Sequence, residues 1–464
     1  MPTQLPLTFQ QQWLWSLLYK QPNWKCMLTY GFRLRGALRL DHLQRSLEGL
    51  IVRHSSLRAR VVVVDGSVMQ EVTEPIAVDL QCISVDGAGS AEIEANARRL
   101  FADFSNQGVN LAVDALLRIT LLKLSDEEHW LLVSTHRLIA DCFSVDQMMP
   151  ELWSLYEETI GDRPISLSPD PPQYHAYAIR QQQNYPEWLK KHGGYWKQRL
   201  DVAQNLRWPS DGSVAQLPRG TLGRMRRLLD EKLSAGLREV ARSERALLAT
   251  VMLAVYVTAL YRFCQQRDFV VPFFVAGRQS QQRSIVGYFS HILYLRMELT
   301  GAETFKDVLS NVANELFRAF THQDFGAIAL QEPRLLQGTF FQWLTWDPEA
   351  ASGLARVAAT GSASLAVERV TMTDFAEDVT AIPPGMVDVE TSFFDTEKGI
   401  YASGVYRADL FTPQTIERFM DELSLVARQF VQNPHAIAAP SSDRISVPWQ
   451  ARECASGKPG AQPR

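Results

Sequence analysis

The chain has 464 residues, of which 46% are hydrophobic and 21% are charged, and its formal net charge is −4. The composition is typical of a globular protein, and the length exceeds one ordinary hydrophobic core, so we expect two lobes of roughly 200 residues each. Because lysine and arginine residues are scattered and the net charge is slightly negative, we expect neither nucleic acid nor a membrane as the main partner.

The first residues and the cysteines bear on the compartment. Residues 1–6 contain no basic region followed by an apolar run, so we expect no secretory signal. The longest apolar run, residues 246–261, carries Thr250 and Thr258 and is short for a membrane span, which favours a core helix. The five cysteines lie far apart and form no CxxC pair, so we expect a reducing cytoplasm. We also expect a monomer without a metal site.

The first part of the chain predicts a mixed α/β layer structure, because segments with helical spacing of apolar residues alternate with short apolar or β-branched runs. The expected helices span residues 7–19, 40–54 and 91–104. The expected strands span residues 28–34, 59–64, 116–124 and 129–135. Proline and serine cluster at residues 164–172, so we place the first lobe at residues 1–168.

The second part of the chain predicts another α/β lobe, at residues 169–440. The expected helices span residues 174–196, 231–242, 246–263, 304–320 and 412–432. The expected strands span residues 269–275, 386–394 and 401–406. Alanine, proline, serine and glycine dominate afterwards, so we expect residues 441–464 to be a disordered tail.

One segment, residues 130–144, places several chemically active side chains between a strand and a helix. Its apolar start predicts a strand, and Ser144 with Gln147 forms a capping-box pattern that predicts a helix start at Ser144. The side chains at the junction are His136, Arg137 and Asp141. An isolated cluster of this kind is more often a structural pair than a functional site, so its meaning depends on the rest of the chain.

Five further stretches, in order along the chain, resemble the motifs of one family. They are residues 5–15, 53–58, 174–178, 285–291 and 322–325. Together they resemble the condensation domains of nonribosomal peptide synthetases, which are relatives of chloramphenicol acetyltransferase, over residues 7–434. The resemblance implies an α/β (α+β layers) fold with two chloramphenicol-acetyltransferase-like lobes, which form a V-shaped pseudo-dimer around a central tunnel.

The segment at residues 130–144 corresponds to the active-site motif of this family, His-His-x-x-x-Asp-Gly, but departs from it twice. His136 and Asp141 match, whereas Arg137 stands at the second histidine, to which the family assigns catalysis, and Cys142 stands at the glycine. The candidate catalytic positions are therefore His136 and Arg137. A guanidinium keeps its proton and cannot act as a general base, but it can donate hydrogen bonds to an oxyanion, a carboxylate or a phosphate.

The resemblance also implies structural roles. Asp141 is expected to pair with Arg278 across the lobes, and Ser144 belongs to the same structural motif. A thiol beside His136 and Arg137 suggests a nucleophile at Cys142. The alternative is a small residue that fills a glycine position, and we favour it because no acyl-enzyme is expected in this fold. The expected tunnel residues are Gly287, Ser290, His291 and His322.

Two functional hypotheses follow from the resemblance. The first is a condensation-type acyltransferase-like protein of nonribosomal peptide or hybrid polyketide biosynthesis, with a remodelled site that acts on carrier-bound acyl thioesters. The second is a catalytically inactive domain that binds carrier proteins or recruits a tailoring enzyme, as glycopeptide recruitment domains do. Those domains resemble the chain in their His-Arg-x-x-x-Asp motif, but have a second Asp where Cys142 stands. No permanently bound cofactor is expected; the partners are an acyl or peptidyl carrier protein with its phosphopantetheine arm, and a small-molecule or carrier-bound acceptor.

Overall fold

The structure is a computed structural model that describes residues 3–20, 24–75, 80–111, 113–161, 170–209, 211, 217–218, 220–324, 333–344, 365–370, 383, 386–396 and 398–439. The expected tail at residues 441–464 lies outside the described residues, as do residues 162–169 at the expected lobe boundary. The boundary between residues 168 and 169 therefore stays a prediction.

The first part of the chain is built on a five-stranded sheet in the order β12-β2-β7-β6-β5. Its strands are β2 (Met27–Gly36), β5 (Gln81–Ser84), β6 (Leu117–Lys123), β7 (Glu128–His136) and β12 (Leu365–Arg369). Alternate residues of β7 point to opposite faces: Leu131 and Val133 pack in the cluster with α2 (Leu40–Arg53) and α4 (Cys142–Ile160), whereas Trp130 and Leu132 pack with α3 (Ser90–Ser105). The sheet is therefore covered on both faces.

A small antiparallel sheet lies at the start of the chain. It contains β1 (Thr3–Pro6), β4 (Ser67–Val72) and β3 (Ala59–Val64), in that order. Helix α1 (Phe9–Lys20) follows β1 and buries the apolar face that the sequence predicts, formed by Trp13, Leu14, Leu17 and Leu18. The Oγ1 of Thr8 accepts a hydrogen bond from the backbone N–H of Gln11 and so caps the start of the helix.

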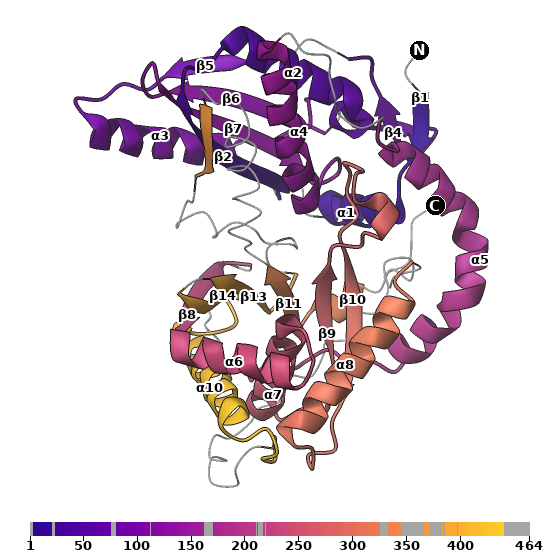
Figure 1. Cartoon of the computed structure of the whole chain (residues 1–464). Helices are drawn as coiled ribbons and strands as arrows, with labels where there is room; N and C mark the ends of the chain where they lie inside the picture. The colour runs from indigo at the N-terminus through magenta and orange to yellow at the C-terminus, as the bar shows by residue number, and fades with distance from the viewer. Residues whose placement is uncertain are drawn as a thin grey trace.

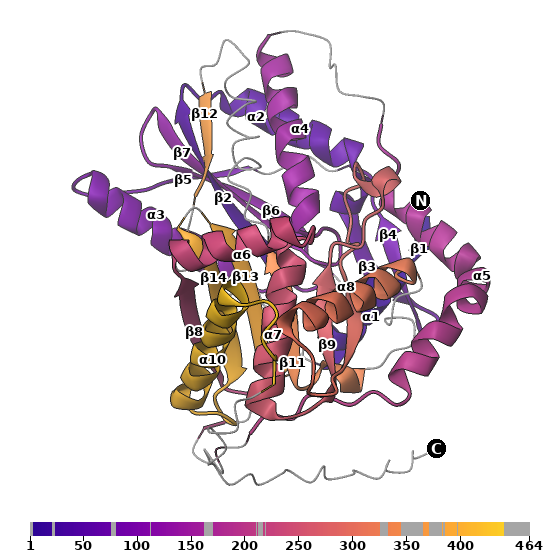
Figure 2. The same cartoon turned by 60° about the horizontal axis from the view of Figure 1, so that its bottom comes forward.

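The second part of the chain is built on a six-stranded sheet in the order β10-β9-β11-β13-β14-β8. Its strands are β8 (Leu222–Leu229), β9 (Asp268–Val275), β10 (His291–Glu298), β11 (Thr339–Leu344), β13 (Val389–Thr396) and β14 (Gly399–Arg407). Figures 1 and 2 show one face covered by α6 (Glu231–Ser243), α7 (Leu248–Cys264), α8 (Phe305–Thr321) and α10 (Pro413–Gln432).

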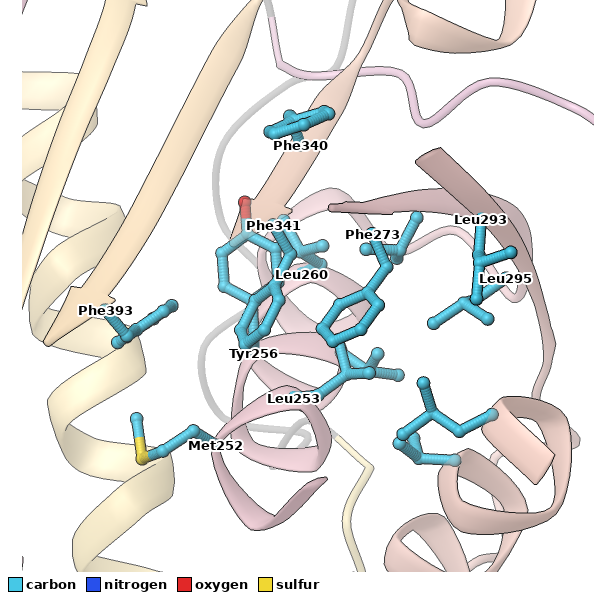
Figure 3. Close-up of a cluster of buried hydrophobic side chains, with 14 of the residues drawn as sticks. Met252, Leu253, Tyr256, Leu260, Phe273, Leu293, Leu295, Phe340, Phe341 and Phe393 are labelled. Carbon is cyan, nitrogen blue, oxygen red and sulfur yellow. The ribbon is translucent and has the colours of Figure 1, made fainter. Parts of the chain in front are cut away.

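Helix α7 is the centre of this core, as the sequence predicts for the apolar run at residues 246–261. Figure 3 shows Tyr256 of α7 among Phe341 and Phe393 of the sheet, and all three rings are buried. Among the described helices, none is by itself long and apolar enough to cross a membrane; α6 and α7, bent by 111° at their break, meet that criterion only as a pair.

Two elements connect the parts of the chain. Helix α5 (Tyr174–Leu200) runs along one side of the molecule from the first part to the second (Figure 1). Strand β12, seen in orange beside β2 in Figure 1, comes from the second part but pairs antiparallel with β2 of the first. Leu365 and Val367 of β12 are buried in the core of the first part, so the pairing is anchored by packing as well as by the backbone ladder.

Candidate functional site

The site forms where β7 ends and α4 begins. His136 is the last residue of β7, and the backbone N–H of Arg137 donates a 3.0 Å hydrogen bond to the carbonyl of Cys26 beside it. Helix α4 begins at Cys142, with Asp141 as its N-cap: the carboxylate accepts the N–H of Ser144 at 2.9 Å. The predicted start at Ser144, capped with Gln147, is wrong. The reason is that Asp141 and Ser144 form the reciprocal box, while Gln147 donates to Glu151 at 2.7 Å.

Asp141 and Arg278 form a buried ion pair that joins the two parts of the chain. The guanidinium of Arg278, which follows β9, donates to the Oδ1 of Asp141 at 2.7 Å, and the two side chains are 5% and 3% exposed. The other carboxylate oxygen of Asp141 accepts the N–H of Phe289 at 3.1 Å. Arg278 also donates to the carbonyls of Gln282 and Ile285 at 3.0 and 2.6 Å. The pair therefore fixes both the start of α4 and the loop before β10.

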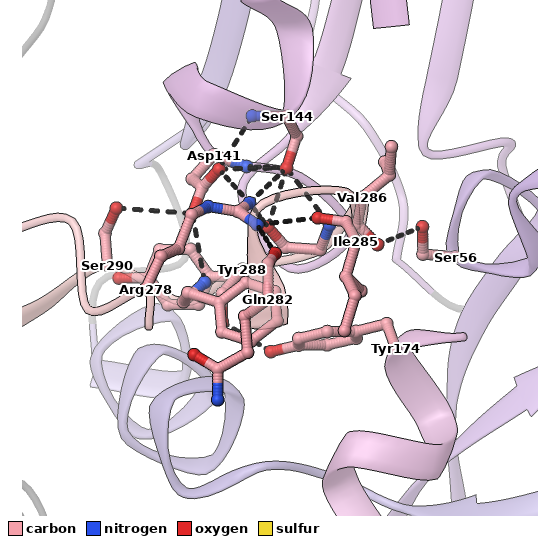
Figure 4. A network of polar contacts seen from close by, with 12 residues as sticks. Ser56, Asp141, Ser144, Tyr174, Arg278, Gln282, Ile285, Val286, Tyr288 and Ser290 are labelled. Atoms are coloured by element: carbon pink, nitrogen blue, oxygen red, sulfur yellow. Dashed lines mark hydrogen bonds and ion pairs between the residues drawn. The ribbon is translucent and has the colours of Figure 1, made fainter. Parts of the chain in front are cut away.

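The loop at residues 285–290 is held against the first part of the chain by further contacts, which Figure 4 shows together with the ion pair. The carbonyl of Val286 accepts a 2.8 Å hydrogen bond from Ser56, and Val286 packs into the core of the first part. Gly287 donates its N–H to Ser144 at 3.0 Å. A Cβ at Gly287 would lie 2.1 Å from the ring of Tyr174, so only glycine fits there.

His136 is buried and tied to the backbone. Its Nδ1 accepts the N–H of Leu138 at 3.2 Å. Burial, followed by the charge of Arg137, lowers the pKa of His136 to about 3. The imidazole is therefore neutral at pH 7 and too weakly basic to remove a proton efficiently from an acceptor amine.

Arg137 is the second candidate catalytic residue, and it is 4% exposed. Its guanidinium has no hydrogen-bond or ion-pair partner within the described ranges. Burial acts to lower the pKa of Arg137, whereas the neighbouring Cys142 and Cys26 act to raise it, and the net result lies above the ordinary value. The position thus holds a permanent, buried positive charge where the family motif has an imidazole.

Tyr288 is a neighbour of Arg137 that the sequence interpretation did not single out, although it lies within the resembling stretch at residues 285–291. Its ring is fully buried, and its hydroxyl has no hydrogen-bond partner in the part of the chain that the structure describes. Burial raises the pKa of Tyr288, and the charge of Arg137 acts in the opposite direction. No sequence pattern could have identified it, because an unpaired hydroxyl results from three-dimensional packing.

Cys142 is the first residue of α4 and is partly exposed. It lies beside Tyr30 of β2: burial and then Cys142 are the main causes that raise the pKa of Tyr30. The φ angle of Cys142 is not positive, so its backbone conformation does not require the glycine of the family motif. Within the described ranges, no three His, Cys, Asp or Glu side chains are arranged to hold a metal ion.

The expected tunnel residues fall into two groups. Gly287, Ser290 and His291 lie near the ion pair: Ser290 donates to Asp141 at 3.5 Å, and the ring of His291 is hydrogen-bonded to the carbonyl of Phe289. His322 ends α8 and contacts α5 instead, with its Nδ1 2.9 Å from the Nδ1 of His192. Their role in a tunnel stays a prediction.

Residues 1–440 match the family model described as the condensation domain. In sequence, the chain is 30% identical over 442 residues to one of the linear gramicidin synthase proteins of Brevibacillus parabrevis. This alignment covers 93% of the chain but only 6% of the synthase protein. The chain thus spans a small part of this relative.

Two solved structures share the fold. The X-domain from teicoplanin biosynthesis has a TM-score of 0.77 and 22% identity, with 94% of this chain and 97% of that chain covered. The condensation domain from the Monacolin K polyketide synthase MokA has a TM-score of 0.78 and 18% identity, with 94% and 99% covered. These likenesses confirm the predicted α/β fold of the chloramphenicol acetyltransferase type.

Proposed function

This chain belongs to the condensation-domain family, and we propose that it binds carrier-tethered acyl or peptidyl thioesters without catalysing ordinary peptide-bond formation. Its partner is a carrier protein of nonribosomal peptide or hybrid polyketide biosynthesis, which presents the thioester on a phosphopantetheine arm. The proposed location is the cytoplasm, where such carriers are loaded.

The observation that carries this proposal is the absence of a proton acceptor at the two motif positions. Amide formation requires the acceptor amine to lose a proton. Arg137 keeps its own protons, and His136 has a pKa lowered to about 3. Loss of a positioned general base typically lowers a rate by about 10²–10⁴-fold. The ion pair between Asp141 and Arg278 is retained, so the frame of the site persists without its base.

The test is an acyl-transfer assay followed by intact-protein mass spectrometry. An acylated donor carrier and an amine-bearing acceptor carrier are incubated with and without the protein. We expect no product above background from the wild type, while the carriers still bind. Restoration by Arg137→His combined with Cys142→Gly would show a condensation site that is disabled at two positions. Rapid transfer by the wild type would contradict the proposal.

A second candidate function is the remodelled transferase that the sequence also predicts. The specific observation in its favour is that, among the described residues, neither the Tyr288 hydroxyl nor the Arg137 guanidinium has a hydrogen-bond partner, which suits the stabilisation of a thioester oxyanion. If this function is correct, the wild type transfers acyl groups rapidly, and Arg137→Ala abolishes the reaction.

The recruiting role is a specific form of the proposed binding function. The X-domain from teicoplanin biosynthesis has been solved in a complex with OxyB, and it shares 22% identity with this chain at a TM-score of 0.76. By analogy we propose a tailoring enzyme as a further partner. Negligible transfer in every Arg137 and Cys142 variant, with retained binding of the carrier or the tailoring enzyme, would support this role.

A further inference from the structure

We infer that Arg137 and Tyr288 form a binding site for a carboxylate, and hence that the ligand of this domain carries one. The inference rests on the proposed function in one respect, namely that Arg137 binds and does not act as a base. It goes further, because it names the chemical class of the group that the site takes.

The first step is the cost of the unpaired charge. A buried ion is expensive to desolvate unless an opposite charge or several hydrogen bonds compensate it. Arg137 is 4% exposed and has neither within the described ranges. In contrast, the two terminal nitrogens of the Arg278 guanidinium, whose side chain is 5% exposed, donate to Asp141 and to three backbone carbonyls, and only Nε lacks a partner among the described residues. An uncompensated buried cation is therefore a candidate for completion by a ligand.

The second step is the second donor. The hydroxyl of Tyr288 is also buried and has no hydrogen-bond partner among the described residues. Tyr288 lies between Gly287 and Phe289, whose backbone N–H groups donate to Ser144 and Asp141 at the start of α4, and the charge of Arg137 acts on its hydroxyl. Two unpaired donor groups that lie close together match an acceptor with two oxygens. A guanidinium presents its N–H groups as a planar fork that fits both oxygens of a carboxylate.

The third step is the charge of the ligand. Burial raises the pKa of Cys26 to about 12, and it also raises the pKa values of Tyr30 and Tyr288, so these three neighbours of Arg137 bring no negative charge at pH 7. The site thus holds a single positive charge. One carboxylate balances it, whereas a phosphate dianion would leave a net negative charge in a buried, largely aromatic surrounding.

The fourth step is access. Cys142, a neighbour of Arg137 and the first residue of α4, is partly exposed. The adjacent Phe143 is 50% exposed. The start of α4, beside which Arg137 lies, therefore reaches the surface.

The test compares pairs of probes that differ only in a carboxylate. For the acyl side, the probes are the N-acetylcysteamine thioesters of succinate and of its monoamide; for the acceptor side, they are alanine and alaninamide. Inorganic phosphate is the third probe. Dissociation constants are measured by calorimetry for the wild type, Arg137→Gln, Arg137→Lys and Tyr288→Phe. Arg39→Gln, which removes an arginine whose side chain is 62% exposed, is the control for the loss of a surface charge.

We expect the wild type and Arg39→Gln to bind the carboxylate member of one pair about 10-fold or more tightly than the amide. Arg137→Gln should remove this preference, Arg137→Lys should keep part of it, and Tyr288→Phe should reduce it about 3-fold. The pair that shows the preference identifies the carboxylate as belonging to the acyl group or to the acceptor.

The inference is overturned if the wild type binds neither carboxylate, binds both members of each pair equally, or prefers phosphate. It is also overturned if Arg137→Gln keeps the preference while its circular dichroism matches the wild type. These outcomes are independent of the acyl-transfer assay. Rapid transfer by the wild type would contradict the proposed function and leave the carboxylate preference intact.

Discussion

Arg278 donates a 2.7 Å hydrogen bond to the Oδ1 of Asp141, and so links the end of β9 to the start of α4. The same carboxylate caps the helix through Ser144 and holds the loop before β10 through Phe289. One side chain therefore satisfies a helix end, a loop and a buried cation. Its loss must affect all three.

We expect Asp141→Ala to lower the free energy of unfolding by about 3–5 kcal/mol, because it leaves the guanidinium of Arg278 buried without its counter-ion. Asp141→Asn keeps an acceptor oxygen and should cost less. Urea denaturation followed by circular dichroism measures both. An unfolding midpoint for Asp141→Ala equal to that of the wild type would contradict the role of the pair as a clamp.

Removal of Arg137 should have the opposite effect on stability. Arg137→Met deletes a buried charge without a protein partner, so the free energy of unfolding should rise by about 1–4 kcal/mol. The matched variant Arg278→Met breaks a buried ion pair and should lower the free energy of unfolding. Urea denaturation measures both variants and so compares a buried arginine without a partner with a buried arginine in an ion pair. A large loss of stability in Arg137→Met would contradict the prediction and show that Arg137 has a structural partner.

Gly287→Ala should lower the free energy of unfolding by about 1–3 kcal/mol, because the added Cβ would lie 2.1 Å from the buried ring of Tyr174. Gly194→Ala is the control. Gly194 lies inside α5 with open space around it, so alanine there should stabilise the helix by about 1 kcal/mol. Thermal unfolding of the two variants should therefore shift in opposite directions.

Acid should destabilise the fold partly through His136. Its pKa is about 3 in the folded chain and ordinarily near 6.5, so between these values only the unfolded chain binds the proton. The free energy of unfolding therefore falls as the pH drops from about 6.5 towards 3, by at most about 1.4 kcal/mol per pH unit from this residue.

The variant that tests this pH dependence is His136→Asn, whose side-chain oxygen can still accept a hydrogen bond from the N–H of Leu138. Its free energy of unfolding should depend less steeply on pH over this window than that of the wild type. Other histidines with lowered pKa values, such as His291, contribute equally to both proteins, so the difference in slope isolates His136. Identical slopes would show that the pKa of His136 is not lowered in the folded chain, and would contradict the prediction.

The sequence predicts the local elements well because their apolar periodicity is strong. Helix α7 and the antiparallel pair β13 and β14 occur where the apolar patterns place them. The start of α4 is two residues earlier than predicted, because an aspartate and a serine both favour the N-cap and only the tertiary partners of Asp141 decide between them.

The site is only partly predictable from the sequence. The pairing of Asp141 with Arg278 follows from the resemblance, because the family pairs the motif aspartate with an arginine at the end of a strand of the second lobe. The isolation of Arg137 and of the Tyr288 hydroxyl could not be predicted, because it depends on which groups the fold leaves out of reach. A sequence shows which donors exist, but the fold decides which donors remain unpaired.

Strand β12 has a practical consequence for work on fragments of this domain. It covers the edge of β2, and its Glu368 forms a 2.9 Å ion pair with Arg35 of that strand. A fragment that ends at residue 168 would lack this cover and expose the edge of β2 at Phe32–Gly36 to other chains. Such a fragment should aggregate during expression, whereas co-expression with residues 169–464 should rescue it by complementation in trans.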